Sequence, residues 1–394
     1  MVYFLVIAFS MMLWLANTPY AAAAGKTYYV ATNGNDGNPC SQSSPCRTIV
    51  HGASLLHPGD TLYVRSGTYN ERPGSADAGN PTLPQGTSWS SPITIAVYPG
   101  DTVTMQGFSF DGTQYIVVDG FIIDGVNYWQ TGIGLGTGPI RVKNTEIKNA
   151  LLHGALGCDG GSCEFYNIHV HHIAYSGTWN CPTDALLGGN GYCHGLYLGH
   201  SNNNIIDGSE FDHIGGYGVH PNPGDNWTIT RNLFHHNWDG FLIYGVGYKV
   251  YNNVSYANHG YGMVSYGSGA TIYNNTFANN PNSAMTLHNS GYTIRNNIFY
   301  GNGGTIEWID GSGGSTVNTN LTTNPSFVNA AAGDFHLQAG SPAIDAGVTV
   351  SEVTTDRDKT PRPQGARFDI GAYQYTGSAP RPLSAPTNRR KAGR

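Results

Sequence analysis

The chain has 394 residues, only 11% of them charged, and it is rich in glycine and tyrosine, with 54 and 25 residues. A chain of this length can bury a large core, and its aromatic content excludes an intrinsically disordered protein. The formal net charge of -6 argues against a nucleic-acid partner, because such a partner calls for a basic face.

The amino-terminal residues have the pattern of an export signal. An uncharged apolar run from Val2 to Leu15 precedes four small residues at positions 21–24. This order is typical of a cleaved secretory signal, and the run is short for a membrane span. An uncleaved anchor is the alternative. We predict a signal peptide over residues 1–24 and a secreted, periplasmic or cell-surface monomer with no stable membrane insertion after cleavage.

Six cysteines fall into three close pairs, Cys40 with Cys46, Cys158 with Cys163, and Cys181 with Cys193. An even number of cysteines in an exported protein favours disulfides, and proximity in the sequence suggests this pairing. A zinc site is the alternative, but the chain has no C-x-x-C spacing of the kind that binds zinc.

The middle of the chain is a repeat. The stretches VYNNVSYANHGYGMV, IYNNTFANNPNSAMT and IRNNIFYGNGGTIEW place Asn253, Asn275 and Asn297 at intervals of 22 residues. Earlier repeats follow with looser spacing. The units contain short alternating β stretches broken by glycine and asparagine, and no amphipathic helix. We therefore predict an all-β protein, a right-handed parallel β-helix of about 8–11 coils.

Stacked coils should align equivalent residues in columns. The expected inward apolar column is Val170, Phe211, Phe234, Phe277 and Phe299. Two residues later we expect an interior polar ladder of His172, His213, His236 and Asn279, with a metal-binding histidine stack as the alternative. The pairs Tyr217-Gly218 and Asp239-Gly240 recur at the next bend, where glycine would supply a positive φ.

Titratable and aromatic residues concentrate in the outward columns of the central coils. We expect them to share one groove. The predicted catalytic residues are Tyr217, His220, Asp239 and His194. The predicted substrate-binding residues are Asn222, His235, Asp212, Tyr197, His171, Lys148 and Trp179. Trp179 belongs to an insertion, since 41 residues separate Asn167 from Gly208, and this insertion could wall the groove.

Three stretches resemble known families. Residues 27–71, beginning YYVATNGNDG, resemble the opening of secreted pectate-lyase-like β-helix proteins, and LQAGSPAIDAG followed by DIGAYQY resembles the closing segment of exported bacterial β-helix proteins. YGVHPN at 217–222 and DGFLIY at 239–244 resemble motifs of mannuronan C5-epimerase modules. The resemblance implies a catalytic role for Tyr217. The family's other functional positions hold His220, Asn222 and Tyr244, so the resemblance implies the lyase and epimerase superfamily more than alginate epimerisation itself.

These observations predict a polysaccharide lyase or epimerase acting on a uronate-containing glycan. His220 would remove the C5 proton and Tyr217 would act as the acid, or as a base if its pKa were depressed. His194 or Asn222 would neutralise the substrate carboxylate, and Asp239 would orient a histidine. We predict no cofactor, with Ca²⁺ as the alternative: an ion held by Asp212, Asp225 or Asp239 could neutralise the carboxylate instead.

Two alternatives stay open. A β-helix glycoside hydrolase would need two carboxylates about 5–10 Å apart. A non-catalytic glycan-binding or cell-envelope β-helix would use the aromatic and asparagine-rich face for binding alone. The expected layout is an amino-terminal cap and first coils over 25–110, central coils over 111–323, a segment over 324–375 that caps the open end, and a disordered tail over 376–394.

Overall fold

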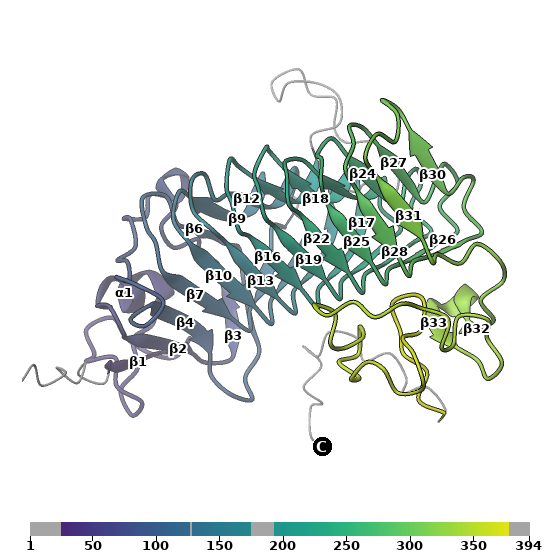
Figure 1. Ribbon diagram of the computed structural model, residues 1–394. Helices are drawn as coiled ribbons and strands as arrows, with labels where there is room; N and C mark the ends of the chain where they lie inside the picture. Colours follow the sequence, from purple (N-terminus) through teal and green to yellow (C-terminus); the bar gives the residue numbers. More distant parts are fainter. Residues whose placement is uncertain (1–24, 127, 175–192, 378–394) are drawn as a thin grey trace, which may run out of the picture.

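The chain winds into an elongated parallel β-helix, seen in a computed structural model that describes residues 25–126, 128–174 and 193–377 (Figure 1). It has about nine turns and almost no helix, so the predicted right-handed parallel β-helix is confirmed. The predicted signal peptide, Trp179, Cys181 and residues 378–394 of the predicted tail lie outside the described residues.

Three parallel sheets run the length of the helix. The 12-stranded sheet contains β1 (Thr27–Val30), β2 (Thr61–Val64), β4 (Ile93–Val97), β7 (Ile116–Asp119), β10 (Ile140–Lys143), β13 (Glu164–Tyr166), β16 (Ile205–Asp207), β19 (Thr228–Thr230), β22 (Lys249–Tyr251), β25 (Thr271–Tyr273), β28 (Thr293–Arg295) and β31 (Thr316–Asn318). The 10-stranded sheet contains β3 (Gly67–Tyr69), β5 (Val103–Met105), β8 (Ile122–Asp124), β11 (Glu146–Lys148), β14 (His169–Ile173), β17 (Glu210–Ile214), β20 (Leu233–His235), β23 (Val254–Tyr256), β26 (Thr276–Ala278) and β29 (Ile298–Tyr300). The 9-stranded sheet contains β6 (Phe108–Ser109), β9 (Thr131–Gly136), β12 (His153–Gly157), β15 (His194–Leu198), β18 (Tyr217–Pro221), β21 (Asp239–Ile243), β24 (Met263–Ser265), β27 (Met285–Leu287) and β30 (Ile306–Trp308).

A few elements lie outside these sheets. They are the helix α1 (Ile49–Ser54), the short 3₁₀ turns η1 (Ala76–Ala78) and η3 (Ala330–Ala332), and an antiparallel pair of β32 (Phe327–Asn329) with β33 (Asp334–Leu337). Helix α1 lies at the amino-terminal end of the coils (Figure 1), and Thr48 caps it by accepting a hydrogen bond from His51 N. Within the described residues, we find no helix long and apolar enough to cross a membrane.

The interior is a column of stacked side chains from successive coils. The register aligns Val170, Phe211 and Phe234, and aligns Phe277 with Phe299, as the sequence predicts. Ring centroids of Phe211 and Phe234 lie 5.0 Å apart. Ser255 interrupts the column and donates a hydrogen bond to Gly262 O at 2.7 Å, so its buried hydroxyl has a partner.

An asparagine ladder holds the corner between the 12-stranded and 10-stranded sheets. Its members are fully buried or half-buried residues of successive coils, Asn232, Asn253, Asn275, Asn297 and Asn320. Asn253 shows the pattern, since its side-chain nitrogen donates to Asn275 Oδ1 at 3.0 Å and to Ile229 O at 2.8 Å. Each side chain therefore satisfies backbone and side-chain groups of its neighbours, and the ladder fixes the register of the coils.

The predicted interior ladder of histidines is wrong. His172 is exposed, and His213 and His236 are half-buried, with φ values of 53°, 52° and 53° in the turn between the sheets. The interior polar ladder begins one residue later, at Asn237, and continues through Asn258 and Asn280 to Asn302. The left-handed turn residue points outward, and the residue after it turns inward. The histidines therefore form a stack on the surface, where His172 and His213 have centroids 4.9 Å apart.

The glycines of the 9-stranded sheet serve a purpose other than the predicted bend. Gly195, Gly218 and Gly240 are strand residues without a positive φ. A Cβ on Gly195 would lie 2.4 Å from Gly218 O, and one on Gly218 would lie 2.7 Å from Gly240 O. Glycine is required there because the next coil passes too close for any side chain.

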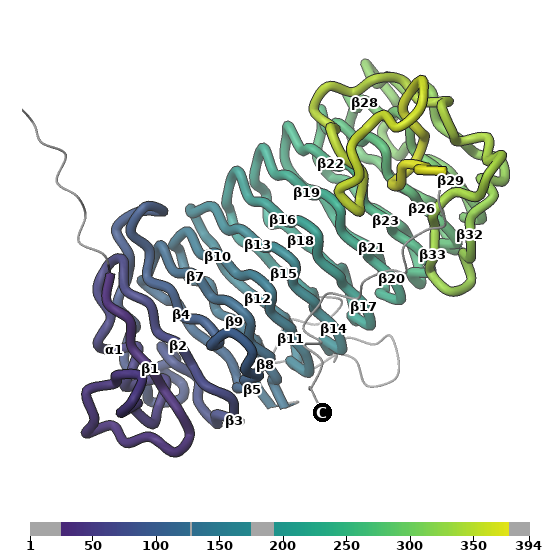
Figure 2. The backbone as a smooth tube through the Cα atoms, turned by 90° about the horizontal axis from the view of Figure 1, so that it is seen from below, coloured from purple at the N-terminus to yellow at the C-terminus, as the bar shows by residue number. Residues whose placement is uncertain are grey.

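The carboxyl-terminal segment lies along the side of the last coils (Figure 2). The side-chain amides of Asn252, Asn274 and Asn296 donate to Thr355 O, Asp369 O and Val348 O. An apolar cluster adds to these bonds, with members from the coils and from the segment, including Leu233, Val254, Ala278, Phe335, Ile370 and Tyr373. The segment predicted to cap the open end therefore forms hydrogen bonds with three successive coils from the side.

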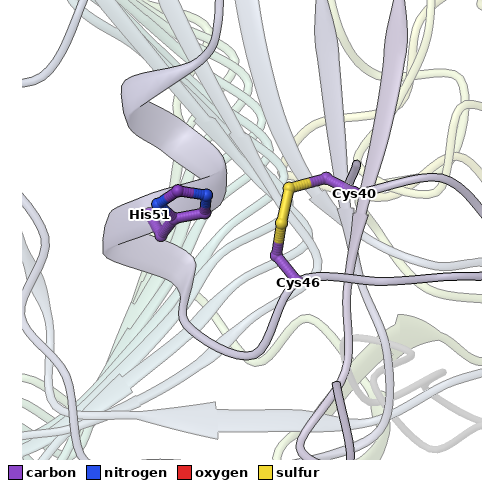
Figure 3. A group of neighbouring side chains, drawn as sticks. All are labelled: Cys40, Cys46 and His51. Carbon is purple, nitrogen blue, oxygen red and sulfur yellow. A yellow bond between two sulfur atoms is a disulfide. The ribbon is translucent and has the colours of Figure 1, made fainter. Parts of the chain in front are cut away.

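The described residues contain two complete predicted disulfides, Cys40–Cys46 and Cys158–Cys163. Cys193 is also disulfide-bonded, while its predicted partner Cys181 lies outside the described residues. His51 lies close to the first disulfide (Figure 3). Both sulfur atoms of that group are in the disulfide, so the group has no thiolate for a metal ion.

We predict that Asn275→Ala lowers the free energy of unfolding by about 3 kcal/mol or more, because several buried groups lose their partners at once. Asn275 Oδ1 accepts from Asn253 N and from the Asn253 side chain, and its own amide donates to Val250 O and Asn297. Urea denaturation measures the change. Asn282→Ala is the control, since Asn282 is exposed in the same coil, and an equal loss in both variants would contradict the role of the ladder.

Candidate functional site

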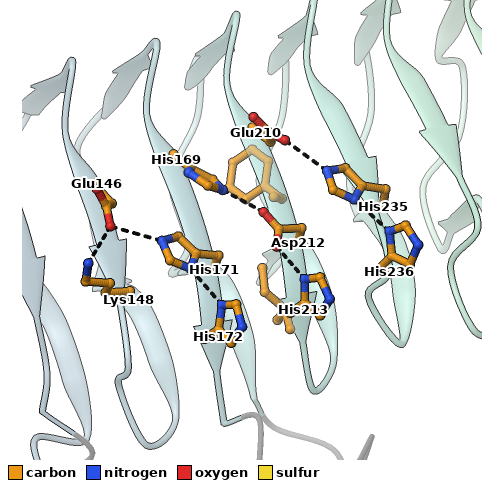
Figure 4. A network of polar contacts seen from close by, with 12 residues as sticks. Glu146, Lys148, His169, His171, His172, Glu210, Asp212, His213, His235 and His236 are labelled. Carbon is orange, nitrogen blue, oxygen red and sulfur yellow. Dashed lines mark hydrogen bonds and ion pairs between the residues drawn. The ribbon is translucent and has the colours of Figure 1, made fainter. Parts of the chain in front are cut away.

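The predicted groove residues divide between two sheets. We call His194, Tyr197, Tyr217, His220 and Asp239, on the 9-stranded sheet, the aromatic site. We call Glu146, His169, His171, Glu210, Asp212 and His235, on the 10-stranded sheet, the carboxylate–histidine array (Figure 4). The prediction of one shared groove is wrong, because each coil turns between these sheets and residues on either side of the turn belong to different faces.

The strands of the 9-stranded sheet position the aromatic site by a repeated pattern. In β18 the partly exposed residues Tyr217 and His220 are separated by buried Gly218 and Val219. The register pairs Tyr197 with His220 and Tyr217 with Asp239. Three successive coils therefore bring the predicted catalytic residues side by side.

The rings of the aromatic site pack against one another. The His194 and His220 rings are stacked with centroids 4.3 Å apart. The His220 ring also lies 5.0 Å from Tyr197 and 5.4 Å from Tyr217, each in an edge-to-face arrangement. Such packing restricts side-chain rotation, so the functional atoms are held in place before any ligand binds.

His194 is the most buried member, with 1% of its surface exposed. Its Nδ1 accepts a hydrogen bond from Tyr217 N at 3.3 Å, so the proton of the neutral ring resides on Nε2. Burial holds the pKa of His194 well below its usual range. Nε2 finds no partner among the described residues, which leaves a buried N–H donor in the site.

Tyr217, His220 and Asp239 have protonation states set by burial. Burial, then the nearby Asp239 carboxylate, raises the pKa of Tyr217, so its hydroxyl stays protonated. Burial lowers the pKa of His220 to about 4, so its ring is neutral near pH 7. Burial raises the pKa of Asp239 to about 6, opposed by hydrogen bonds from Tyr261 N, at 2.6 Å, and from Tyr217. The site thus places a proton acceptor, the neutral His220 ring, beside a proton donor, the Tyr217 hydroxyl.

The outer face of the aromatic site has no basic side chain in its central strands. Strands β12, β15, β18 and β21 contain no lysine or arginine. Asn222, a predicted binding residue, is half-buried just after β18, where its backbone N–H donates to Leu198 O at 2.6 Å. A ligand here would therefore meet no cationic side chain from these strands.

The four predicted binding residues on the 10-stranded sheet are already paired within the carboxylate–histidine array. Lys148 Nζ and His171 Nε2 contact Glu146 Oε1 at 2.6 and 3.2 Å. His235 Nε2 contacts Glu210 Oε1 at 2.9 Å, and Asp212 Oδ2 contacts His169 Nε2 at 2.6 Å. Figure 4 shows the three histidine–carboxylate contacts crossing from coil to coil, whereas Lys148 and Glu146 lie on the same strand, β11.

Three members of the array, Glu146, His169 and Glu210, are absent from the predicted site. A signal for them was present, because Glu146-x-Lys148, His169-x-His171 and Glu210-x-Asp212 each place two polar side chains on one face of a strand. The predicted calcium ligands do not converge. Asp212, Asp225 and Asp239 lie on β17, in the turn after β18, and on β21, and no described group of three candidate ligands contains Asp225 or Asp239.

Comparisons with known proteins agree on the fold. A family model described as "Right handed beta helix region" matches residues 189–322. Pectate lyase Pel9A superimposes with a TM-score of 0.65 at 17% identity, covering 90% of this chain and 97% of that chain. The structure titled "The complex structure of XylC with xylose" has a TM-score of 0.56 at 12% identity, covering 88% and 98%. A glycoside hydrolase has a TM-score of 0.57 at 8% identity, covering 80% and 99%.

A curated relative matches a smaller part of the chain. The uncharacterized protein YwoF of Bacillus subtilis (strain 168) is 29% identical over 92 residues. That match spans 23% of this chain and 18% of the relative. At these identities the comparisons show a parallel β-helix, and they leave the chemistry to the residues of the site.

We predict that Asp239→Asn raises the free energy of unfolding near pH 8 by up to about 3 kcal/mol, because burial raises the carboxyl pKa from 3.8 to about 6. A group with a raised folded pKa stabilises the fold fully below its unfolded pKa, and this stabilisation is lost as pH rises through about 6. The difference between variant and wild type should therefore vanish near pH 4.

Urea denaturation across this pH range measures the difference. The control is Asp77→Asn, because Asp77 is exposed and its substitution should change stability little at any pH. If Asp239→Asn were less stable than wild type near pH 8, burial of the ionised Asp239 carboxylate would not destabilise the fold, and the prediction would be wrong.

Proposed function

We propose that this β-helix is an exported, carbohydrate-active enzyme whose aromatic site removes the C5 proton of a uronate residue in a polysaccharide. The observation that carries the proposal is the pairing of His220 and Tyr217, with ring centroids 5.4 Å apart and complementary protonation states. The likeness of the fold to pectate lyase Pel9A supports a carbohydrate substrate but does not assign one.

In the proposed reaction the neutral His220 ring takes the C5 proton. For a lyase, the electrons of that C–H bond form a C4–C5 double bond as the C4–O bond breaks. The Tyr217 hydroxyl then gives its proton to the leaving oxygen. For an epimerase, a proton instead returns to C5 on the opposite face of the sugar. The raised pKa of Tyr217 favours its role as acid over its role as base.

Removal of the C5 proton requires that charge on the neighbouring carboxyl group be stabilised. The Nε2–H of His194 is a buried donor without a partner among the described residues, and it lies in the ring stacked on His220. We assign to it the hydrogen bond to the substrate carboxylate. The absence of basic residues from β15, β18 and β21 favours a sparsely charged glycan over a fully charged polyuronate.

The alternative is a glycoside hydrolase. It is favoured by one observation, the adjacency of Glu210 and Asp212 on the outer face of β17. Their histidine partners His235 and His169 stabilise the ionised carboxylates and hold the pKa of both below the usual range. Neither carboxyl group is therefore suited to donate a proton, and the hydrolase ranks second.

Export is part of the proposal. The disulfides Cys40–Cys46 and Cys158–Cys163 are typical of an oxidising compartment outside the cytoplasm. The predicted signal peptide over residues 1–24 agrees with them.

The full chain, incubated with a panel of acidic and neutral polysaccharides, should produce unsaturated or inverted uronates visible by proton NMR. We predict that Tyr217→Phe and His220→Gln each lower this rate about 100-fold or more, because each removes one proton-transfer group. Tyr63→Phe is the matched control, since Tyr63 lies on β2 of the 12-stranded sheet. New reducing ends without unsaturation would favour the hydrolase, and binding without any product would refute the enzyme.

The pH profile tests the base. Because burial lowers the pKa of His220 to about 4, we expect kcat/KM to rise with pH through about 4 and to be nearly full at pH 5.5. A solvent-exposed histidine base would instead give half of the full rate near pH 6.5. The Asp239→Asn variant should keep the same acid limb, which separates titration of His220 from that of Asp239.

A further inference from the structure

Asp212 occupies an unusual position on the outer face of the 10-stranded sheet. Its side chain lies between two imidazoles, with Oδ2 at 2.6 Å from His169 Nε2 and Oδ1 at 2.5 Å from His213 Nδ1. Asp212 is only 7% exposed, whereas His169 and His213 are half-buried. Both oxygens of a nearly buried carboxylate thus face nitrogen atoms that solvent can reach.

Glu210 brings a second carboxylate to the same place. The parallel register sets His169 of β14 directly beside Glu210 of β17, and Asp212 follows two residues later on the same face. One ligand atom from each of His169, Glu210 and Asp212 lies within 4.8 Å of the other two. A rearrangement of side-chain torsions alone could bring these three atoms around one ion.

We propose that His169, Glu210 and Asp212 bind a divalent first-row transition-metal ion such as Zn²⁺ on the outer face of the 10-stranded sheet, with water in the remaining positions. The site is independent of the sugar chemistry proposed for the aromatic site, because its three ligands lie on a different sheet.

The set of donors determines the class of ion. Calcium prefers six to eight oxygen ligands, whereas one imidazole with two carboxylates suits zinc and its neighbours in the first row. Two carboxylates and a neutral imidazole also supply negative charge that a divalent ion would neutralise.

Supporting contacts orient the ligands, as is usual for metal sites. His235 Nε2 holds Glu210 Oε1 at 2.9 Å, and His235 Nδ1 contacts His236 Nδ1 at 2.8 Å. His213 holds the far oxygen of Asp212. Figure 4 shows His235 beside Glu210 on the next coil, and His213 below Asp212 on the same strand. Each carboxylate therefore keeps one oxygen bonded to a histidine while the other oxygen can serve as a ligand.

An ion at this site would join two coils, since His169 comes from β14 and both carboxylates come from β17. Zinc should therefore stabilise the fold as well as bind, because an ion that binds only the folded state shifts the unfolding equilibrium.

The full chain, treated with a chelator and dialysed, is titrated with ZnCl₂ by calorimetry and with CoCl₂ by visible absorption. We predict about one ion per chain, a higher melting temperature with zinc, and binding at least tenfold weaker in Asp212→Asn, His169→Gln and Glu210→Gln. Circular dichroism in the presence of chelator establishes that each variant is folded. The three single variants test the same site, so one unstable variant leaves two that decide.

Two controls define the site. Asp119→Asn removes a carboxylate that pairs with Lys143 on the 12-stranded sheet, and it should leave the affinity unchanged. His172→Gln should also leave it unchanged, although His172 approaches Asp212 and His213 closely. The proposal is overturned if wild type binds neither ion, if Asp212→Asn binds normally, or if His172→Gln abolishes binding while His169→Gln does not.

Discussion

The structure depends on one constraint, the residue-to-residue register between successive coils. Asn253, Asn275 and Asn297 illustrate how it is enforced, since each buried amide bonds the equivalent amide of the next coil and a backbone carbonyl of the previous one. A coil shifted by one residue would leave all of these groups unsatisfied. Because the register is fixed, every position in a coil becomes a column along the molecule, and a column can carry either packing or chemistry.

The same register explains why two polar clusters with different properties lie so near in sequence. On the 9-stranded sheet, columns of rings pack closely and keep His220 and His194 neutral. On the 10-stranded sheet, carboxylates of one coil accept hydrogen bonds from histidines of the next. Burial dominates the first cluster, and side-chain hydrogen bonds between coils dominate the second. Five residues and one turn are enough to separate Asp212 from Tyr217 and to place them in these two environments.

The sequence alone predicts the fold and the adjacency of Tyr217, His220 and Asp239. The 22-residue interval predicts the coil, and the alignment of these three residues follows from it. The 22-residue interval does not show which side chains point inward at each turn. A residue with a positive φ at His213 or His236 reverses which neighbour points inward. The sequence pattern therefore predicts the histidine column inside the β-helix, whereas it lies on the surface. For the same reason the sequence predicts one groove, whereas the residues lie on two faces. The repeat interval also does not predict the contacts of Glu210 with His235 and of Asp212 with His169, because these residues are far apart in the sequence.

The carboxyl-terminal segment affects how the β-helix unfolds from its last coil. Its hydrogen bonds with Asn252, Asn274 and Asn296 connect three successive coils along one side of the β-helix. Strand β31, whose side chains are all exposed, lies beyond these bonds. We therefore expect opening at that end to stay confined to the last turn, and thermal fraying to stop before it reaches the coils of Tyr217 and Asp239.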